Sequence, residues 1–131
     1  MREAARELGA AHIALGHHAD DQAETVLLRL LRGAGAAGLG AMAMVGPGPM
    51  IRPMLELTRA EIMRYLEALG ARFVVDSSNA SSAMLRNRVR LELIPTLERD
   101  YAPGLRRRLV ELAAEMRDLD HLVRTLARRE S

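Results

Sequence analysis

The sequence contains no cysteine and no tryptophan, and only one phenylalanine and two tyrosines among its 131 residues. The lack of cysteine excludes disulfides, cysteine-ligated zinc, iron–sulfur ligation and a thiol nucleophile within this segment. The scarcity of aromatic rings disfavours RNA binding by stacking of bases on aromatic side chains. A chain without thiols also fits a reducing compartment, and we expect a cytoplasmic protein.

Long apolar runs and lysine are missing as well. No segment approaches the roughly 20 apolar residues of a membrane-spanning helix, and the charged start is unlike a signal peptide, so we expect no membrane partner. All 19 basic residues are arginine, which either a GC-rich coding sequence or a use in bidentate phosphate contacts would explain. Since the net charge is only +2, any case for nucleic-acid binding rests on local clusters.

Short apolar segments recur along the first 76 residues and alternate with amphipathic segments. Three of them have the length and composition of buried strands: His12–Leu15, Met50–Arg52 and Arg72–Val75. Alternating strands and helices are typical of a parallel sheet covered by helices. We therefore predict an α/β fold in residues 1–76, followed by a helical region in residues 77–131 that ends in a long helix.

Two amphipathic helices lie between the predicted strands. In Asp20–Arg32 the apolar residues recur at i, i+3, i+4, i+7 and i+8, which places them on one face. Asp21 and Glu24 have the spacing of a capping box at the start of this helix. Thr58 and Glu61 have the same spacing at the start of the second helix.

The last part of the chain has a different pattern. From Leu105 to Leu126 the apolar residues repeat at alternating steps of four and three, which is a heptad seam about three repeats long. Such a seam packs either against the protein's own core or against another subunit or domain, and both remain open. Pro95 and Pro103 predict breaks before this helix. Three consecutive arginines at its start, 106–108, are best explained as a solvated face.

The segment Gly16–Thr25, with the sequence GHHADDQAET, lies where a predicted strand hands over to a helix. In open α/β sheets, ligands bind at the carboxyl ends of the strands. The carboxylates of Asp20 and Asp21 suit Mg²⁺, and the two imidazoles can orient or protonate a reacting group. The amino end of the helix also favours an anion such as phosphate.

Each of these residues also has a structural explanation when it is taken alone. Asp20 or Asp21 would serve as an ordinary N-cap, and Glu24 as an ordinary capping-box partner. Neighbouring histidines in a strand point apart, so His17 and His18 make a poor zinc pair. The whole string at one strand–helix junction goes beyond these explanations and points to a functional site.

The string resembles the PP-loop ATPases of tRNA modification, and among them the tRNA(Ile)-lysidine synthetases. The resemblance extends over residues 2–101, because three further blocks are similar in the same order. They are RGAG at 32–35 with GLGAM at 38–42, IRPML at 51–55, and DSSN at 76–79 with RNRVR at 86–90. The resemblance implies that residues 1–76 form the later part of a PP-loop ATPase domain, a partial Rossmann-like parallel sheet, and residues 77–131 its helical tRNA side.

The activity that this resemblance implies is an ATP-dependent ligation. ATP adenylates the C2 oxygen of the wobble cytidine in a tRNA(Ile) with a CAU anticodon, and the amine of L-lysine then attacks C2 and displaces AMP. ATP, Mg²⁺, L-lysine and tRNA(Ile) are the implied cofactors and partners. Polyphosphate charge must be neutralised by cations in such a step, which fits the residues of the string.

The resemblance also implies roles for individual residues. His18, Asp20 and Asp21 would be catalytic and line the ATP side, with Asp20 and Asp21 as magnesium ligands. His17 and Glu24 would support them on the same side.

On the tRNA side, the resemblance implies Arg86, Asn87 and Arg90. Because Arg86 and Arg90 are four residues apart, we expect them to share one helix face, which suits two neighbouring phosphates.

The family's Ser-Gly-Gly-x-Asp-Ser loop, which cradles phosphate, has no counterpart in this sequence. The glycine-rich stretch 33–48 has neither that pattern nor a Walker lysine. We expect a segment of a longer enzyme that is inactive alone, although a chain that has lost catalysis would look similar. A sheet without its first strands exposes an apolar edge, so we predict self-association, such as a homodimer, through this edge or the terminal helix.

Two other functions are compatible with the pattern. One is a non-catalytic tRNA- or RNA-binding module that uses the face of Arg86 and Arg90. The other is a tRNA thiolation enzyme of the same superfamily, which the absence of cysteine disfavours for this segment.

Overall fold

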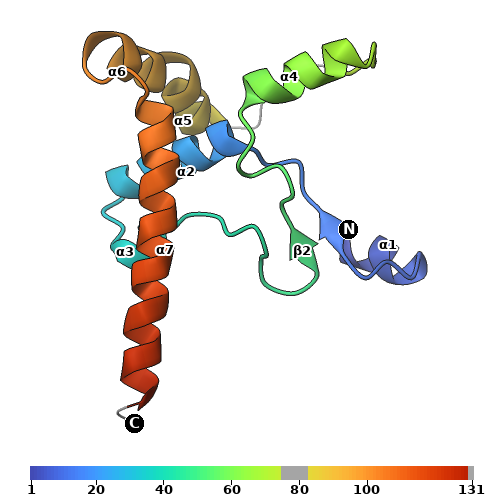
Figure 1. Cartoon of the computed structure of the whole chain (residues 1–131), viewed down its shortest axis with the longest axis horizontal. Helices are drawn as coiled ribbons and strands as arrows, with labels where there is room; N and C mark the ends of the chain where they lie inside the picture. Colours follow the sequence, from blue (N-terminus) through green and yellow to red (C-terminus); the bar gives the residue numbers. More distant parts are fainter. Residues whose placement is uncertain (75–82, 130–131) are drawn as a thin grey trace.

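The chain is described by a computed structural model over residues 1–74 and 83–129 (Figure 1). Its elements, in chain order, are α1 (Arg2–Glu7), β1 (Ile13–Ala14), α2 (Ala19–Leu31), α3 (Ala36–Leu39), β2 (Met50–Ile51), α4 (Arg59–Ala68), α5 (Ala83–Arg88), the π-helix η1 (Val89–Leu93), α6 (Ile94–Asp100) and α7 (Leu105–Arg129). The DSSN block at 76–79 and the predicted boundary between residues 76 and 77 lie outside the described residues, so this division stays a prediction.

β1 and β2 pair in parallel, as the alternation of strands and helices predicts. Ile13 is in register with Met50, and the amide of Leu15 extends the pairing by donating to the carbonyl of Ile51 at 2.9 Å. Each strand has two residues and is shorter than the predicted segment.

The third predicted strand, Arg72–Val75, is not formed at residues 72–74, and Val75 lies outside the described residues. Phe73 and Val74 are exposed, at 48% and 93%. A strand requires a neighbour's peptide groups, and no strand in the described part of the chain pairs with this segment.

α2 begins one residue before the predicted start, and its capping differs from the expected one. His18 is the N-cap in extended conformation, and its amide donates to Asp21 Oδ2 at 3.1 Å. The pairing of Asp21 with Glu24 that the spacing predicted is therefore wrong. The cap is shifted because Asp20 and Asp21 already lie in the first turn, where carboxylates stabilise a helix, and Glu24 lies one turn further on.

α4 begins as predicted, with Thr58 as N-cap and Glu61 closing the capping box. Thr58 Oγ1 accepts from the amide of Glu61 at 3.2 Å, and the amide of Thr58 donates to Glu61 Oε2 at 2.8 Å. No residue of α4 is buried, and Figure 1 shows this helix reaching away from the other helices.

The hydrophobic core lies between α2, the η1–α6 segment and α7. Its buried residues are Ala23, Val26, Leu27, Val89, Ile94, Leu109 and Ala113. The core therefore joins the helix that follows β1 to the helices of the C-terminal region, and it fixes the amino end of α2 relative to η1 and α7.

The break predicted at Pro95 is wrong, because helical structure continues through it. The break predicted at Pro103 is confirmed, since this residue separates α6 from α7. Helical structure continues from α5 through Pro95 to Asp100, and the turn that precedes Ile94 and Pro95 is the π-helix η1. Proline lacks an amide hydrogen and crowds the preceding turn, so a wider turn accommodates it. This π-helix carries Arg90.

The heptad seam of α7 is covered over only part of its length. Leu109 is buried in the core, whereas Leu119, Val123 and Leu126 are 44 to 56% exposed. Figure 1 shows the carboxyl half of α7 extending beyond the other helices. No helix in residues 1–74 and 83–129 is long and apolar enough to cross a membrane.

Candidate active site at the junction of β1 and α2

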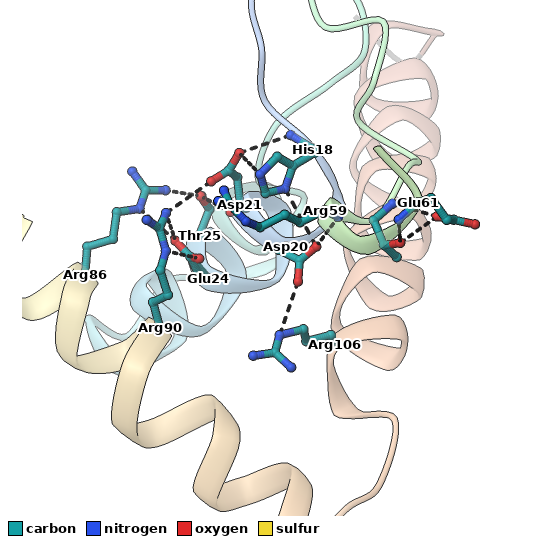
Figure 2. Close-up of polar contacts among 11 residues, drawn as sticks. His18, Asp20, Asp21, Glu24, Thr25, Arg59, Glu61, Arg86, Arg90 and Arg106 are labelled. Carbon is teal, nitrogen blue, oxygen red and sulfur yellow. Dashed lines mark hydrogen bonds and ion pairs between the residues drawn. The ribbon is translucent and has the colours of Figure 1, made fainter. Parts of the chain in front are cut away.

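The start of α2 faces side chains from α4, α5, η1 and α7 (Figure 2). Between them lies a cleft of about 780 Å³, lined by Gly16, His18, Asp20, Asp21, Glu24, Arg59, Phe73, Val74, Arg90, Leu91 and Arg106. Three carboxylates and three guanidiniums are among these residues, so the cleft brings charges of both signs together. This arrangement can bind an anion through the guanidiniums and orient a cation or a proton through the carboxylates.

The two aspartates at the start of α2 contact different elements. Asp20 Oδ2 accepts from the amide of Arg59 at 2.8 Å, and its Oδ1 lies 3.4 Å from Arg106 Nε. Asp21 Oδ2 accepts from the amide of His18, and its Oδ1 lies 3.3 Å from Arg90 Nη2. Asp20 therefore links α2 to α4 and α7, and Asp21 links it to η1.

The imidazole of His18 lies over the same two carboxylates. His18 Nδ1 is 3.7 Å from Asp20 Oδ2, and Nε2 is 3.5 Å from Asp21 Oδ2. Nδ1 is buried and has no hydrogen-bond partner within the described structure. The three residues predicted to be catalytic thus lie together at one wall of the cleft.

Glu24 is buried, with 3% of its side chain exposed, and it pairs with Arg90 in a bidentate manner. Arg90 Nε donates to Glu24 Oε1 at 2.7 Å, and Arg90 Nη2 donates to Oε2 at 3.0 Å. These hydrogen bonds raise the pKa of the Arg90 guanidinium above its ordinary value. A buried carboxylate needs such a partner, because an unpaired charge would be costly at this depth.

Arg86 also reaches α2, so Arg86 and Arg90 share one face as their spacing predicts. Arg86 Nη2 donates to Thr25 Oγ1 at 2.7 Å, and Arg86 Nε lies 3.4 Å from Glu24 Oε2. Asn87, the third residue predicted on the tRNA side, is partly buried on the same helix. A role of these residues in tRNA binding stays a prediction.

Arg106 belongs to the cleft, and its interpretation as part of a solvated face was wrong. Besides Asp20, its guanidinium contacts Glu98 of α6 through Nη1. Its neighbour Arg107 is 80% exposed and pairs with Glu111 one turn further along α7. The spacing along a helix distinguishes the two arginines only when the direction of the core is known, because they lie on different faces.

His17 lies outside the cleft lining and contacts the end of β2. Arg52 Nε donates to His17 Nδ1 at 3.2 Å. Burial lowers the pKa of His17 below its ordinary value, and the positive charges of Arg52 and Arg86 act in the same direction, against the opposing effect of Asp21. Since a guanidinium only donates, this contact requires a neutral imidazole with an unprotonated Nδ1.

The glycine-rich loop after α2 is held by two residues that the sequence analysis missed. The side-chain amide of Gln22 exchanges two hydrogen bonds with the backbone of Met42, at 2.8 and 3.0 Å. Arg117 Nη1 donates to the carbonyls of Gly40 and Met42, at 2.6 and 2.9 Å. Gly40 is required here, since a Cβ would lie 2.8 Å from Arg117 Cγ. The signal for Gln22 was a polar side chain on an apolar helix face, which must find buried partners.

The predicted magnesium ligands supply only part of a metal site. No group of three histidine, aspartate or glutamate side chains within residues 1–74 and 83–129 is arranged to hold a metal ion. Asp20 and Asp21 do offer the oxygen atoms that Mg²⁺ prefers, and each already contacts an arginine. The residues fit Mg²⁺ only if a bound nucleotide or water adds further oxygens, and the assignment stays a prediction.

Comparison with protein families matches residues 1–97 to a model described as a PP-loop domain. Among curated proteins, the chain is 50% identical to the tRNA(Ile)-lysidine synthase of Geobacter sulfurreducens over 125 residues, covering 95% of this chain and 26% of that protein. It is 39% identical to the tRNA(Ile)-lysidine synthase of Symbiobacterium thermophilum over 131 residues, covering 98% of this chain and 27% of that protein. The chain thus spans about a quarter of the length of these relatives.

A solved structure has a similar fold. It is the U34-tRNA thiolase NcsA from Methanococcus maripaludis with its 4Fe-4S cluster, with a TM-score of 0.61 and 22% sequence identity. The similarity covers 87% of this chain and 39% of that chain. At this identity the likeness concerns the fold, and it agrees with the predicted α/β architecture.

Proposed function

The chain belongs to the PP-loop domain family, and from this membership we propose that it forms part of the reaction site of a tRNA(Ile)-lysidine synthase. The proposed reaction joins L-lysine to C2 of the wobble cytidine of tRNA(Ile) at the expense of ATP, in the cytoplasm. The observation that carries the proposal is the cleft at the start of α2, built by the GHHADDQAET string in a chain that is similar to curated lysidine synthases.

The chemistry requires two displacements. The C2 oxygen of the cytidine attacks the α-phosphorus of ATP and pyrophosphate leaves; the lysine amine then attacks C2, and AMP leaves with the former base oxygen. The amine loses a proton in the second step. The cleft supports both needs, because its guanidiniums can stabilise phosphate charge and its carboxylates and imidazole can hold or accept a proton.

On the ATP side we propose His18, Asp20 and Asp21, supported by His17 and Glu24. The two aspartates would hold Mg²⁺ together with oxygens of the nucleotide, and the metal would neutralise polyphosphate charge. Their position at the amino end of α2 also adds the favourable field of the helix for a phosphate group.

On the tRNA side we propose Arg86, Asn87 and Arg90. Arg90 has 45% of its side chain exposed while it contacts both Glu24 and Asp21. It can therefore meet a phosphate or the reacting nucleotide on its open side and remain fixed to the ATP side through the carboxylates.

The proposal can be tested in a chimera in which this chain replaces the matching quarter of the Geobacter sulfurreducens relative. Lysidine in tRNA(Ile) is measured by mass spectrometry of digested tRNA, and tRNA affinity by filter binding. We expect lysidine to form only when ATP and lysine are both present. Changing Asp20 and Asp21 together to Asn should lower the rate at least about 100-fold, because charge stabilisation in the transition state is lost, with tRNA affinity within about threefold.

The matched control is Asp118→Asn with Asp120→Asn, which removes the same charge on α7 away from the cleft, and it should keep full activity. A folded chimera that binds tRNA(Ile) but makes no lysidine would contradict the proposal. If the Asp20→Asn, Asp21→Asn variant lost tRNA affinity but kept its rate per bound tRNA, the result would instead favour a non-catalytic RNA-binding module.

A further inference from the structure

Asp20 is held from two sides by elements that are distant in sequence. The amide of Arg59, at the start of α4, donates to Asp20 Oδ2 at 2.8 Å, and Arg106 Nε lies 3.4 Å from Oδ1 (Figure 2). Arg106 stands on α7, beyond the residues that the PP-loop family model matches. The site therefore includes a contribution from a helix outside the matched domain.

We propose that Arg106 is a positioning residue of the site, which fixes the carboxylate of Asp20 toward the cleft. This inference rests on the proposed function for the role of Asp20, but the geometry that it concerns is independent of any reaction.

The contacts of Arg106 favour a positioning role over direct binding of an anion. Glu98 accepts from the backbone amide of Arg106 at 3.1 Å and also from its guanidinium Nη1, so one carboxylate holds both the backbone and the end of the side chain. On the other side of the guanidinium, Nε of Arg106 faces Oδ1 of Asp20. With two carboxylates in contact, the guanidinium is charge-compensated before any substrate arrives, and 35% of the side chain is exposed.

Asp20 needs this restraint because a second cavity lies on its other side. Asp20 and Arg106 line both the cleft and a pocket of about 250 Å³ that also includes Ala19, Glu56, Thr58, Arg107 and Val110. The Asp20–Arg106 pair therefore stands between the two spaces. Without the guanidinium, the carboxylate can rotate toward the second pocket and away from His18. A misplacement of about 1 Å in a reaction site can lower the rate about 100-fold.

The positioning can be measured in the 131-residue chain without any reaction. The amide proton of Arg59 reports the place of Asp20 because it donates to that carboxylate, and its NMR resonance should move when the acceptor leaves. Asp20→Ala sets the full change. We expect Arg106→Gln to move the resonance at least half as far in the same direction, and Arg106→Lys to move it less.

The matched control is Arg108→Gln, which changes the same charge on the same turn of α7 but is exposed and lines neither the cleft nor the second pocket. It should leave the Arg59 resonance in place. An unmoved resonance in Arg106→Gln, or an equal movement in Arg108→Gln, would overturn the positioning role whatever the reaction proves to be.

The chimera then separates positioning from substrate binding. We expect Arg106→Gln to lower kcat by about tenfold or more, with KM for ATP and for tRNA within about threefold, and Arg106→Lys to recover part of the loss. A raised KM with unchanged kcat would instead mean that Arg106 binds substrate directly. Because the NMR result stands alone, a failure of the ligase assignment and a failure of the positioning role are distinguishable.

Discussion

Glu24 shows how a single residue joins the two sides of the cleft. It is a buried carboxylate on α2 whose charge is matched by Arg90 of η1, and Arg86 approaches it as well. Its spacing in the sequence indicated a capping role, but in the structure its carboxylate pairs with Arg90, which is distant in sequence. The partner could not be predicted, because the two residues are far apart in sequence and only the packing of η1 on α2 brings them together.

Replacing Glu24 should destabilise the chain. Glu24→Gln leaves the Arg90 guanidinium without its bidentate acceptor, and we expect a loss of about 2 kcal/mol in the free energy of unfolding, reduced from that of a fully buried pair because Arg90 is half exposed. Urea unfolding measures this. Glu92→Gln, in the exposed pair with Arg88, is the matched control and should cost less than about 0.5 kcal/mol. Equal losses would mean that the ion pair at Glu24 contributes nothing specific.

His17 should make stability depend on pH. Burial lowers its pKa in the folded chain below the ordinary value of 6.5, so the unfolded chain binds the proton more readily. The free energy of unfolding should therefore fall as the pH drops below that value, and the His17 contribution should be constant above it. Unfolding of the parent and of His17→Gln at pH values above and below 6.5 tests this. The parent should lose more stability on acidification than the variant, and equal losses would show that His17 is not responsible.

At the scale of elements, local patterns predicted α2, α4 and α7 closely, because caps and apolar periodicity are local signals. The prediction of a strand was wrong at residues 72–74, since a strand depends on pairing with a neighbour that the local sequence does not contain. The π-helix η1 was missed for a different reason: Pro95 marks a disturbance of the helix, but whether the chain breaks or widens depends on the packing of Ile94 in the core.

The packing of this helical run on α2 can be tested through Ile94, which is fully buried. Ile94→Ala should lower the free energy of unfolding by about 3 kcal/mol, because it leaves a cavity between α2, α6 and α7. Leu91→Ala, in η1 but 71% exposed, is the control and should cost less than about 0.5 kcal/mol. Similar losses from both substitutions would contradict the placement of the core.

On the scale of the whole molecule, apolar surface remains uncovered on the outer half of α7 and on α4. Leu119, Leu122, Val123 and Leu126 are exposed on the outer half of α7, and α4 has no buried residue. The heptad pattern predicted the seam of α7 but left open what covers it, and this chain covers only its first half.

We expect the chain to associate with itself at micromolar concentration, because contiguous exposed apolar surface favours burial against a second copy. Sedimentation velocity measures this. Val123→Glu with Leu126→Glu should shift the distribution toward monomer if the terminal helix forms the contact. A monomeric parent chain would contradict the expectation. An unchanged distribution in the variant would indicate that the contact lies at the sheet edge.

We propose that the reaction takes place in the cleft between α2 and η1. Arg90 and Arg88 test it most directly, since both stand on the same helical run, but Arg90 contacts Glu24 and Asp21 while Arg88 pairs with exposed Glu92. The measurement is the single-turnover rate of lysine transfer to tRNA(Ile) in the chimera. We expect Arg90→Gln to lower this rate at least about 100-fold and Arg88→Gln to leave it within about twofold. Equal rates for the two variants would contradict it.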